Sequence, residues 1–206
     1  LNFLGINNLL LLRGDSMPLD IAEKDLCLYH EHATDLQEQV NRFNQGIGLD
    51  GSKIEGIETP FSYGMACYPE KHEEAPNMES DLFYLKEKVR NGADYVVTQM
   101  FFDNEKYYAF VERCRQEGID VPIIPGIKPV VFKNQLNVLP KVFRTDIPEA
   151  FASELRKCTT DEEVKAVGVE WCKAQCKDLL AHGVPGLHFY TFMASDSVYK
   201  VAKEVY

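Results

Sequence analysis

The sequence predicts an α/β fold, namely a (β/α)8 TIM barrel of which this chain holds about the last five β/α units. Apolar segments of strand length alternate about five times with segments of helical periodicity. The apolar segments are hydrophobic throughout, and such strands need helices on both faces of a parallel sheet. Polar residues follow several of these strands, and function at the carboxyl ends of many strands is typical of a barrel.

Five short apolar segments are the expected strands. They are residues 8–12, 61–67, 95–98, 121–127 and 187–191. Alternating strands and helices also allow a doubly wound open sheet. The glycine-rich turn G-x-G-x-x-G that usually marks a Rossmann sheet is not expected in this chain, so the barrel is favoured.

Seven segments with helical spacing connect and follow these strands. They are residues 33–46, 76–91, 104–117, 133–142, 148–156, 160–182 and 195–206. Gly92 and Gly118 stand just past two of the helix ends, and Thr160 with Glu163 forms a capping box. Asp103 is expected to cap the helix that starts at the next residue.

The length of the chain bears on how much of a barrel it holds. A complete barrel has about eight β/α units and typically about 250 residues, whereas this chain has 206 residues. We therefore expect a single catalytic barrel domain over residues 1–206 whose N-terminal part, about three units, is missing. The apolar opening is interpreted as a buried strand and not as a signal peptide, because it is short and lacks a basic region.

Charge and cysteine content exclude some classes of function. The chain has 22 Lys and Arg against 32 Asp and Glu, a net charge of −10, which argues against nucleic acid as a partner. No apolar run is long enough for a membrane span. The 6 cysteines form no C-x-x-C pair, so reduced thiols in the cytoplasm are expected. Cys172 and Cys176 share a helix face without further ligands nearby in sequence, so no metal site is expected.

Polar side chains stand at the carboxyl ends of the predicted strands. They are Asp15, Tyr68, Gln99, Lys128 and Tyr190. After the first strand, Asp15 either forms a turn ion pair with Arg13 or places a carboxylate over a ligand that approaches the backbone at Gly14. The residues themselves leave these two interpretations about equal.

The second strand and the helix after it offer further candidates. Gly64 and Ala66 would leave room for a flat ligand against the backbone, and Tyr68 and His72 could stack on a ring. A solvated loop histidine is the alternative for His72. On the helix, Asp81, Tyr84 and Lys88 share a stripe, which is either a solvated face or a site where Asp81 accepts from a hydroxyl and Lys88 meets a phosphate.

Gln99 is an amide at the end of an apolar strand with no evident local partner. Burying it unpaired would cost about 1–3 kcal/mol. A heterocycle with adjacent N–H and C=O groups would satisfy both ends of the amide. Phe101 and Phe102 would be either apolar walls of that site or core residues.

Several motifs together resemble one family. They are "RGD" after an apolar strand, "CYPEKHEEA", "DLFYLKEKVRNGADYVVTQMFFD", "GIDVPIIPGIKPV" and "LHFYTF", in this order. The sequence resembles methylenetetrahydrofolate reductases, most closely bacterial-type enzymes with only a catalytic domain. The resemblance implies a barrel that binds FAD. NADH or NADPH would reduce the flavin, and the flavin would then reduce 5,10-methylenetetrahydrofolate to 5-methyltetrahydrofolate for methionine synthesis in a ping-pong reaction.

The resemblance also implies roles for individual residues. The residues implied to bind FAD are Arg13, Gly14, Asp15, Ala66, Tyr68, His72, Ala75, Asp81 and Lys88. Among them, Asp15 would be catalytic and would favour the cationic iminium form of the folate, while Asp81 and Lys88 would hold the ADP portion. Gln99 would be catalytic too, contacting the pterin and the nicotinamide. Gln135 and Tyr190 would line the folate site.

The chain departs from the family pattern at three places. Tyr84 and Glu87 stand where some relatives have an Asn and an Arg, and Ala194 stands where some have a folate-contacting arginine. The general acid of the family is a glutamate on a first strand that is not part of these residues. Two alternatives stay open: another FAD barrel of the proline dehydrogenase kind, which would want an arginine cluster, and an inactive truncated barrel that only binds nucleotide. A homo-oligomer is expected.

Overall fold

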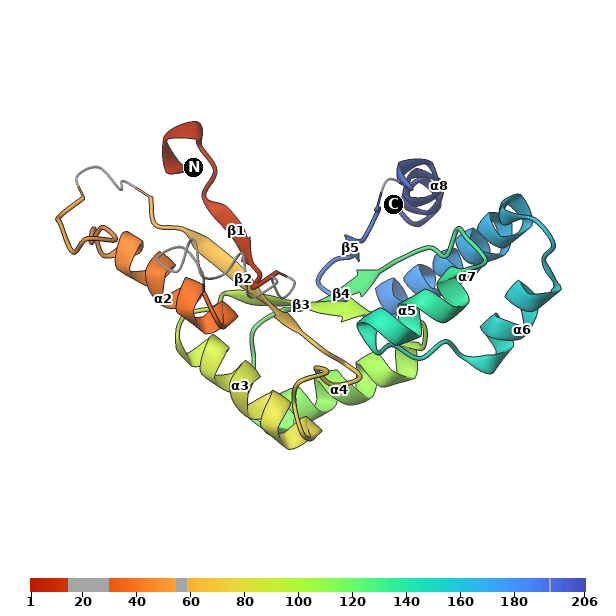
Figure 1. The fold of residues 1–206 in the computed structure, drawn as a ribbon, viewed down its shortest axis with the longest axis horizontal. Coiled ribbons are helices and arrows are strands. Elements are labelled where there is room, and N and C mark those ends of the chain that lie inside the picture. Colours follow the sequence, from red (N-terminus) through yellow and green to blue (C-terminus); the bar gives the residue numbers. More distant parts are fainter. Residues whose placement is uncertain (15–29, 55–58, 193) are drawn as a thin grey trace, which may run out of the picture.

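The computed structural model describes residues 1–14, 30–54, 59–192 and 194–206. Its strands form one parallel sheet in the order β1-β2-β3-β4-β5, with β1 at Asn8–Leu11, β2 at Ser62–Cys67, β3 at Tyr95–Met100, β4 at Ile123–Ile127 and β5 at His188–Phe189 (Figure 1). A doubly wound sheet would reverse its strand order at a switch point. The sequential order instead makes a curled half-barrel, consistent with a partial TIM barrel.

The helices follow the predicted plan closely. They are α2 at Ala33–Asn44, α3 at Met78–Arg90, α4 at Asn104–Gln116, α5 at Gln135–Phe143, α6 at Glu149–Lys157, α7 at Asp161–Ala181 and α8 at Ser195–Val205, with a short 3₁₀ turn at Asn2–Leu4. Each predicted end of a helix or strand lies within two residues of the observed one. The predicted caps are confirmed, since Asp103 accepts from the Glu105 N–H and Thr160 and Glu163 form the capping box.

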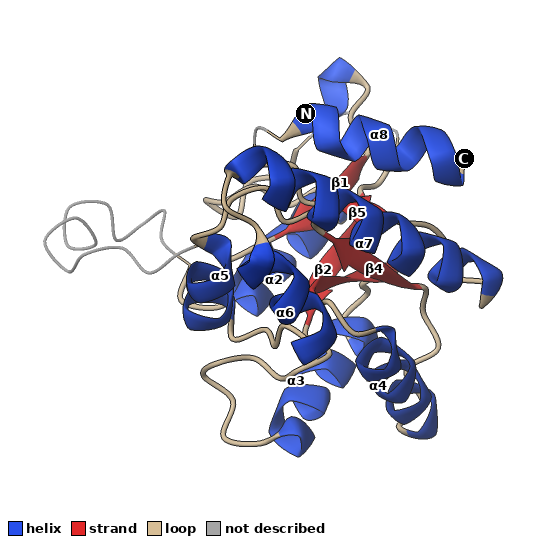
Figure 2. Ribbon diagram, turned by 90° about the vertical axis from the view of Figure 1, so that its right-hand side faces the viewer, coloured by secondary structure: helices blue, strands red, loops and turns tan. Residues whose placement is uncertain are grey.

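The main core lies between the sheet and the helices outside its curve. In both ribbon views α3 and α4 lie side by side below the strands (Figure 1, Figure 2). Met65 of β2, Val96 of β3 and Ile123 and Ile127 of β4 belong to this core. Because successive strand residues point to opposite faces, the residues between them face the concave side.

Two tyrosines cross this concave face and lie over glycines. Tyr95 covers Gly64, where an added Cβ would stand 2.2 Å from its ring, and donates to the Leu9 carbonyl at 2.8 Å. Tyr190 covers Gly126, with its ring 2.6 Å from the position of an added Cβ, and donates to the Thr98 carbonyl. The space expected for a ligand at Gly64 is therefore filled by Tyr95.

A second core joins the end of β3 to α5, α6 and α7. Phe102 is buried there against Phe151, and Phe101 is buried in the main core, where its ring stacks on Tyr107. Both phenylalanines are therefore core residues, which settles the alternative between wall and core.

A G-x-G-x-x-G match does occur at residues 46–51. It follows helix α2 and forms a turn closed by an Ile47–Lys53 bridge. Because no strand precedes it and no helix starts from it, it is not a dinucleotide-binding turn.

Candidate functional site

An ion pair joins the end of β1 to the loop after β2. Arg13 donates to both carboxylate oxygens of Glu74 at 2.8 and 2.9 Å, which lowers the pKa of Glu74. Gly14, the next residue, has a left-handed φ of 81°. The predicted catalytic Asp15 lies outside the described residues, so both interpretations of the Arg13–Asp15 turn stay predictions.

The loop after β2 carries a pair of neutral rings. Tyr68 and His72 meet edge to face with 4.6 Å between ring centroids, and His72 Nδ1 accepts from the Glu74 N–H at 3.1 Å. Burial raises the pKa of Tyr68 to about 12 and lowers the pKa of His72. His72 is thus half-buried and packed, and it is not the solvated loop histidine that was the alternative.

Asp81 and Lys88 of α3 point at this loop and strand end. Asp81 accepts from the His72 N–H at 2.8 Å, and the Lys88 ammonium donates to the Ala66 carbonyl at 3.2 Å. Burial lowers the pKa of Lys88, and the Asp81 carboxylate opposes this shift. The three residues of the predicted stripe therefore differ: Asp81 and Lys88 contact the protein, whereas Tyr84 is solvated and 58% exposed. Ala75 lies in the same loop and accepts at its carbonyl from Lys71.

Gln99 lies inside β3 and not at its end, because the strand continues to Met100. Its side-chain carbonyl accepts from the Met100 N–H at 2.9 Å, so the expectation that it lacks a local partner is wrong for the oxygen. Within the described part of the chain, no hydrogen bond satisfies its NH₂ group. A ligand could therefore be recognised by the two N–H donors of this half-buried amide.

The side chains of Gln135 and Tyr190 both form hydrogen bonds with backbone groups. Gln135 stands in the first turn of α5, and its side-chain oxygen accepts from the Val131 and Phe132 N–H groups at 2.7 and 3.1 Å. The Tyr190 hydroxyl is engaged on Thr98 at 2.9 Å, and burial raises its pKa to about 12. The NH₂ group of Gln135 and the ring of Tyr190 are what these residues could offer a ligand.

Lys128 directly follows β4, which lies between β3, the strand of Gln99, and β5, the strand that Tyr190 follows. Its position at a strand end was evident from the sequence, but no role followed from it. The residue is only 3% exposed, and its ammonium lies 4.5 Å from the centroid of the Phe192 ring. Only the structure could show this burial, since a lysine in a sequence is ordinarily taken as solvated.

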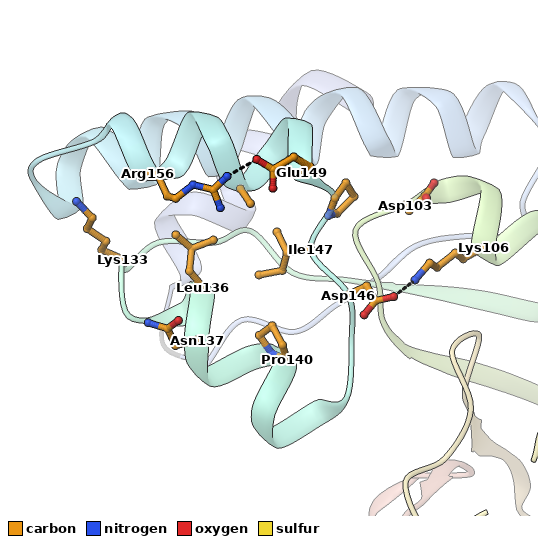
Figure 3. A pocket seen from close by; sticks show the side chains of 12 residues that line it. Asp103, Lys106, Lys133, Leu136, Asn137, Pro140, Asp146, Ile147, Glu149 and Arg156 are labelled. Atoms are coloured by element: carbon orange, nitrogen blue, oxygen red, sulfur yellow. Dashed lines mark hydrogen bonds and ion pairs between the residues drawn. The ribbon is translucent and has the colours of Figure 1, made fainter. Parts of the chain in front are cut away.

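A cavity of about 750 Å³ lies apart from these residues, between α5, α6 and the start of α4 (Figure 3). Each cation on its wall already has a partner: Lys106 pairs with Glu70 and Asp146, Arg156 with Glu149, and Lys133 donates to the Cys158 carbonyl. The balanced charges give no preference for an anionic or cationic ligand. The strand ends are therefore the stronger candidate site.

Two other expectations concern metals and membranes. Within residues 1–14, 30–54, 59–192 and 194–206, no group of three or more His, Cys, Asp or Glu is placed to hold a metal ion. The same described residues contain no helix with the length and apolar character needed to cross a membrane. Cys172 and Cys176 are buried free thiols.

The curled parallel sheet is consistent with the β/α-barrel class, and the strand ends form its candidate site. A family model described as methylenetetrahydrofolate reductase matches residues 2–206. The chain belongs to the methylenetetrahydrofolate reductase family, and the resemblance noted from the motifs is confirmed.

Individual relatives agree with this assignment. The chain is 33% identical over 206 residues to a Caenorhabditis elegans probable methylenetetrahydrofolate reductase (NADPH), covering 98% of this chain and 28% of the relative. It is 32% identical over 198 residues to the 5,10-methylenetetrahydrofolate reductase of Pectobacterium carotovorum, covering 96% and 59%. For the Escherichia coli enzyme the identity is 39% over 142 residues, covering 68% and 48%. The chain thus spans between about a quarter and three fifths of these relatives.

A solved structure of an uncharacterized protein from Clostridium thermocellum, described as binding two copies of 5-methyl-5,6,7,8-tetrahydrofolic acid, is also similar. Its TM-score is 0.49 at 17% identity, covering 73% of this chain and 55% of that one.

Proposed function

We propose that this chain works as a 5,10-methylenetetrahydrofolate reductase that uses FAD and NADH or NADPH in a ping-pong reaction. The observation that carries the proposal is the match of the family model to residues 2–206. The geometry supports it, because Tyr68, Gln99 and Tyr190 stand at or near the ends of strands in one curled sheet.

The residues around the ends of β1 and β2 fit a flavin nucleotide. Lys88 presents a largely buried ammonium whose hydrogen bond within the described residues is to a neutral carbonyl, so it retains donors for a phosphate. Tyr68 and His72 add a neutral, half-buried ring pair for a planar group. We call this group the flavin half of the proposed site. Arg13, Gly14 and Ala66 would complete it, with Ala75 in the neighbouring loop. Bound FAD would supply the hydride-transfer chemistry that protein side chains lack.

Asp81 contributes to the flavin half indirectly, by holding the loop that carries His72. By accepting from the His72 N–H it fixes the loop that carries the ring pair. We assign it the positioning of His72, together with the role toward the ADP portion that the family resemblance implies. Asp15 keeps its proposed role of stabilising a cationic form of the folate.

The folate half lies at the ends of β3, β4 and β5. Gln99 would donate from its NH₂ group to a pterin acceptor, since its oxygen is held by the Met100 N–H. That internal bond fixes the orientation of the amide and makes its free end a donor. Gln135 and Tyr190 would line the same half, with their backbone hydrogen bonds keeping them in place.

A spectroscopic experiment tests the whole proposal. The purified protein is examined for flavin absorbance, with or without added FAD, and then for bleaching by NADH or NADPH. Return of the absorbance on addition of methylenetetrahydrofolate or menadione would establish the two halves of a ping-pong reaction. A protein that takes up no FAD would overturn the proposal.

Substitution of Gln99 tests the division of the site. Gln99→Ala should weaken use of methylenetetrahydrofolate by about ten-fold or more, the effect of one or two lost hydrogen bonds. FAD content should stay unchanged. Gln116→Ala, at the exposed end of α4, is the matched control and should alter neither. An equal loss of flavin and folate binding in Gln99→Ala would contradict the assignment.

A further inference from the structure

Lys128 is a buried residue whose ammonium group has no counter-charge among the described residues. No hydrogen bond or ion pair joins its ammonium to any residue in the described ranges, and it lies over the face of the Phe192 ring, 4.5 Å from the ring centroid. Burial lowers the pKa of Lys128 with no charged neighbour contributing to the shift. The ammonium is not among the enclosed unpartnered polar atoms of the described residues, so the stem of Lys128 is buried while its nitrogen keeps some contact with solvent. A cation–π contact offsets only part of the hydration that such a group loses.

The direction of the Lys128 side chain follows from the strand alternation. Ile123 and Ile127 pack into the main core on the helix side of the sheet. Gly126 therefore faces the concave side, where the Tyr190 ring covers it. Lys128, two residues on, continues that face and reaches Phe192, which stacks on Tyr190.

The Phe192 ring is not firmly held in its position over this ammonium. Its side chain is on a residue that is 62% exposed, and its backbone has a left-handed φ of 39°, which is unfavourable for a residue with a large side chain. The ring contacts Phe143 only at 6.4 Å between centroids. A ligand that displaced this ring would reach an ammonium with three unused donors.

We propose that Lys128 binds an oxygen atom of the folate substrate by a charge-assisted hydrogen bond. The inference rests on the proposed function and adds a residue to it. The sheet order puts β4 between β3 and β5, hence Lys128 between Gln99 and Tyr190 in the folate half. The two cations proposed to bind FAD lie elsewhere. Arg13 follows the carboxyl end of β1, and Lys88 reaches β2 from α3. The oxygen is either the pterin carbonyl or a glutamyl carboxylate, which share this chemistry.

The test replaces Lys128 by methionine, which is similar in length and uncharged. Lys128→Met should raise the KM for methylenetetrahydrofolate by about ten-fold or more. It should also reduce by a similar factor the affinity for 5-methyltetrahydrofolate measured by calorimetry. FAD content should stay as in the unsubstituted protein. Lys141→Met, an exposed lysine of α5, serves as the matched control and should change none of these values.

Stability distinguishes a ligand-binding lysine from a structural one. Without folate, Lys128→Met should melt at the same temperature as the parent protein or a few degrees higher, because an unpaired, partly dehydrated charge is removed. A lower melting temperature, or a variant that does not fold, would show that the ammonium holds the structure and would overturn the proposal. Unchanged folate affinity, or loss of FAD with the folate, would overturn it too.

A second ligand separates the two oxygen sources. 5,6-Dimethyltetrahydropterin lacks the benzoyl and glutamyl groups and carries no carboxylate, so a loss of affinity in Lys128→Met for both ligands would place the lysine on the pterin carbonyl. A loss confined to 5-methyltetrahydrofolate would place it on the carboxylate. If the parent protein binds FAD but neither folate, the proposed substrate is wrong. If the parent binds folate and Lys128→Met binds it equally, only the role of Lys128 is wrong.

Discussion

Gly168 in the middle of α7 provides a stability test in which two physical effects oppose each other. Helix propensity alone favours Gly168→Ala by about 1 kcal/mol. The fold opposes it, because an added Cβ would stand 1.9 Å from the Val130 carbonyl oxygen and 2.8 Å from its carbon. These are backbone atoms, so relief requires α7 to move by more than 1 Å from the segment that follows β4.

The magnitude follows from the size of that movement. Overpacking a well-packed core costs about 1–3 kcal/mol, and a clash with backbone belongs at or above the upper end of this range. After subtraction of the propensity gain, we expect Gly168→Ala to lose about 2 kcal/mol of unfolding free energy. For a chain of this size that loss corresponds to a melting temperature lower by about 4–8 °C.

Ala174→Gly in the same helix calibrates the propensity term. Ala174 is exposed, so its replacement should cost only the propensity difference of about 1 kcal/mol. Thermal unfolding of both variants and the parent is followed by circular dichroism. If Gly168→Ala raises the melting temperature by about as much as Ala174→Gly lowers it, α7 does not approach Val130 as described and the reasoning is refuted.

Three further outcomes are expected. Tyr63→Phe should lose about 1–2 kcal/mol in urea unfolding, because the buried hydroxyl bonds Asn41 at 2.7 Å and the Asn91 carbonyl at 3.0 Å, whereas exposed Tyr84→Phe should be neutral. Glu70→Gln should slow neither folding nor flavin uptake but lower the melting temperature by a few degrees, since its carboxylate binds both Lys106 at 2.6 Å and the Asp146 N–H at 2.8 Å; an unchanged melting temperature would show that these bonds are not formed. Burial lowers the pKa of His188 below 6.5, so folding favours its neutral form and stability falls as pH drops below about 6.5. Between pH 7.5 and 5.5, the parent should therefore lose more stability in urea unfolding than His188→Gln, and an equal loss would contradict the shift.

Much of the fold could be predicted because its signals are local. Capping residues such as Asp103 and the Thr160–Glu163 box fix helix starts from neighbours in sequence, and continuous apolar runs mark parallel strands. The end of β3 was missed by two residues, since Gln99 is polar yet belongs to the strand. Its extension depends on pairing with β4, where the register shifts between Val97 and Met100. Such a pairing is not encoded in the strand itself.

The positions of the candidate residues in the fold could be predicted from the sequence, whereas their interactions could not. Tyr68, Gln99 and Tyr190 do lie at or near the strand ends, but the partners of Gln99 and Tyr190 are backbone groups that no spacing rule identifies. The burial of Lys128 likewise depends on Phe192, a residue 64 positions further along the sequence. Contacts between distant segments decide which polar residues retain free donors, and they require the folded chain.

Under the proposed function, the two tyrosine bridges direct a ligand to one end of the concave face. Tyr95, at the start of β3, crosses Gly64 to the Leu9 carbonyl and fills the face near the amino ends of the first three strands. A barrel interior is a packed core and not a pore, so this filling is expected there. Tyr190 follows the last strand and crosses only to Thr98, before Gln99. Beyond it lie the half-buried amide of Gln99 and the ammonium of Lys128, which a ligand from the carboxyl ends would reach once the Phe192 ring moved aside.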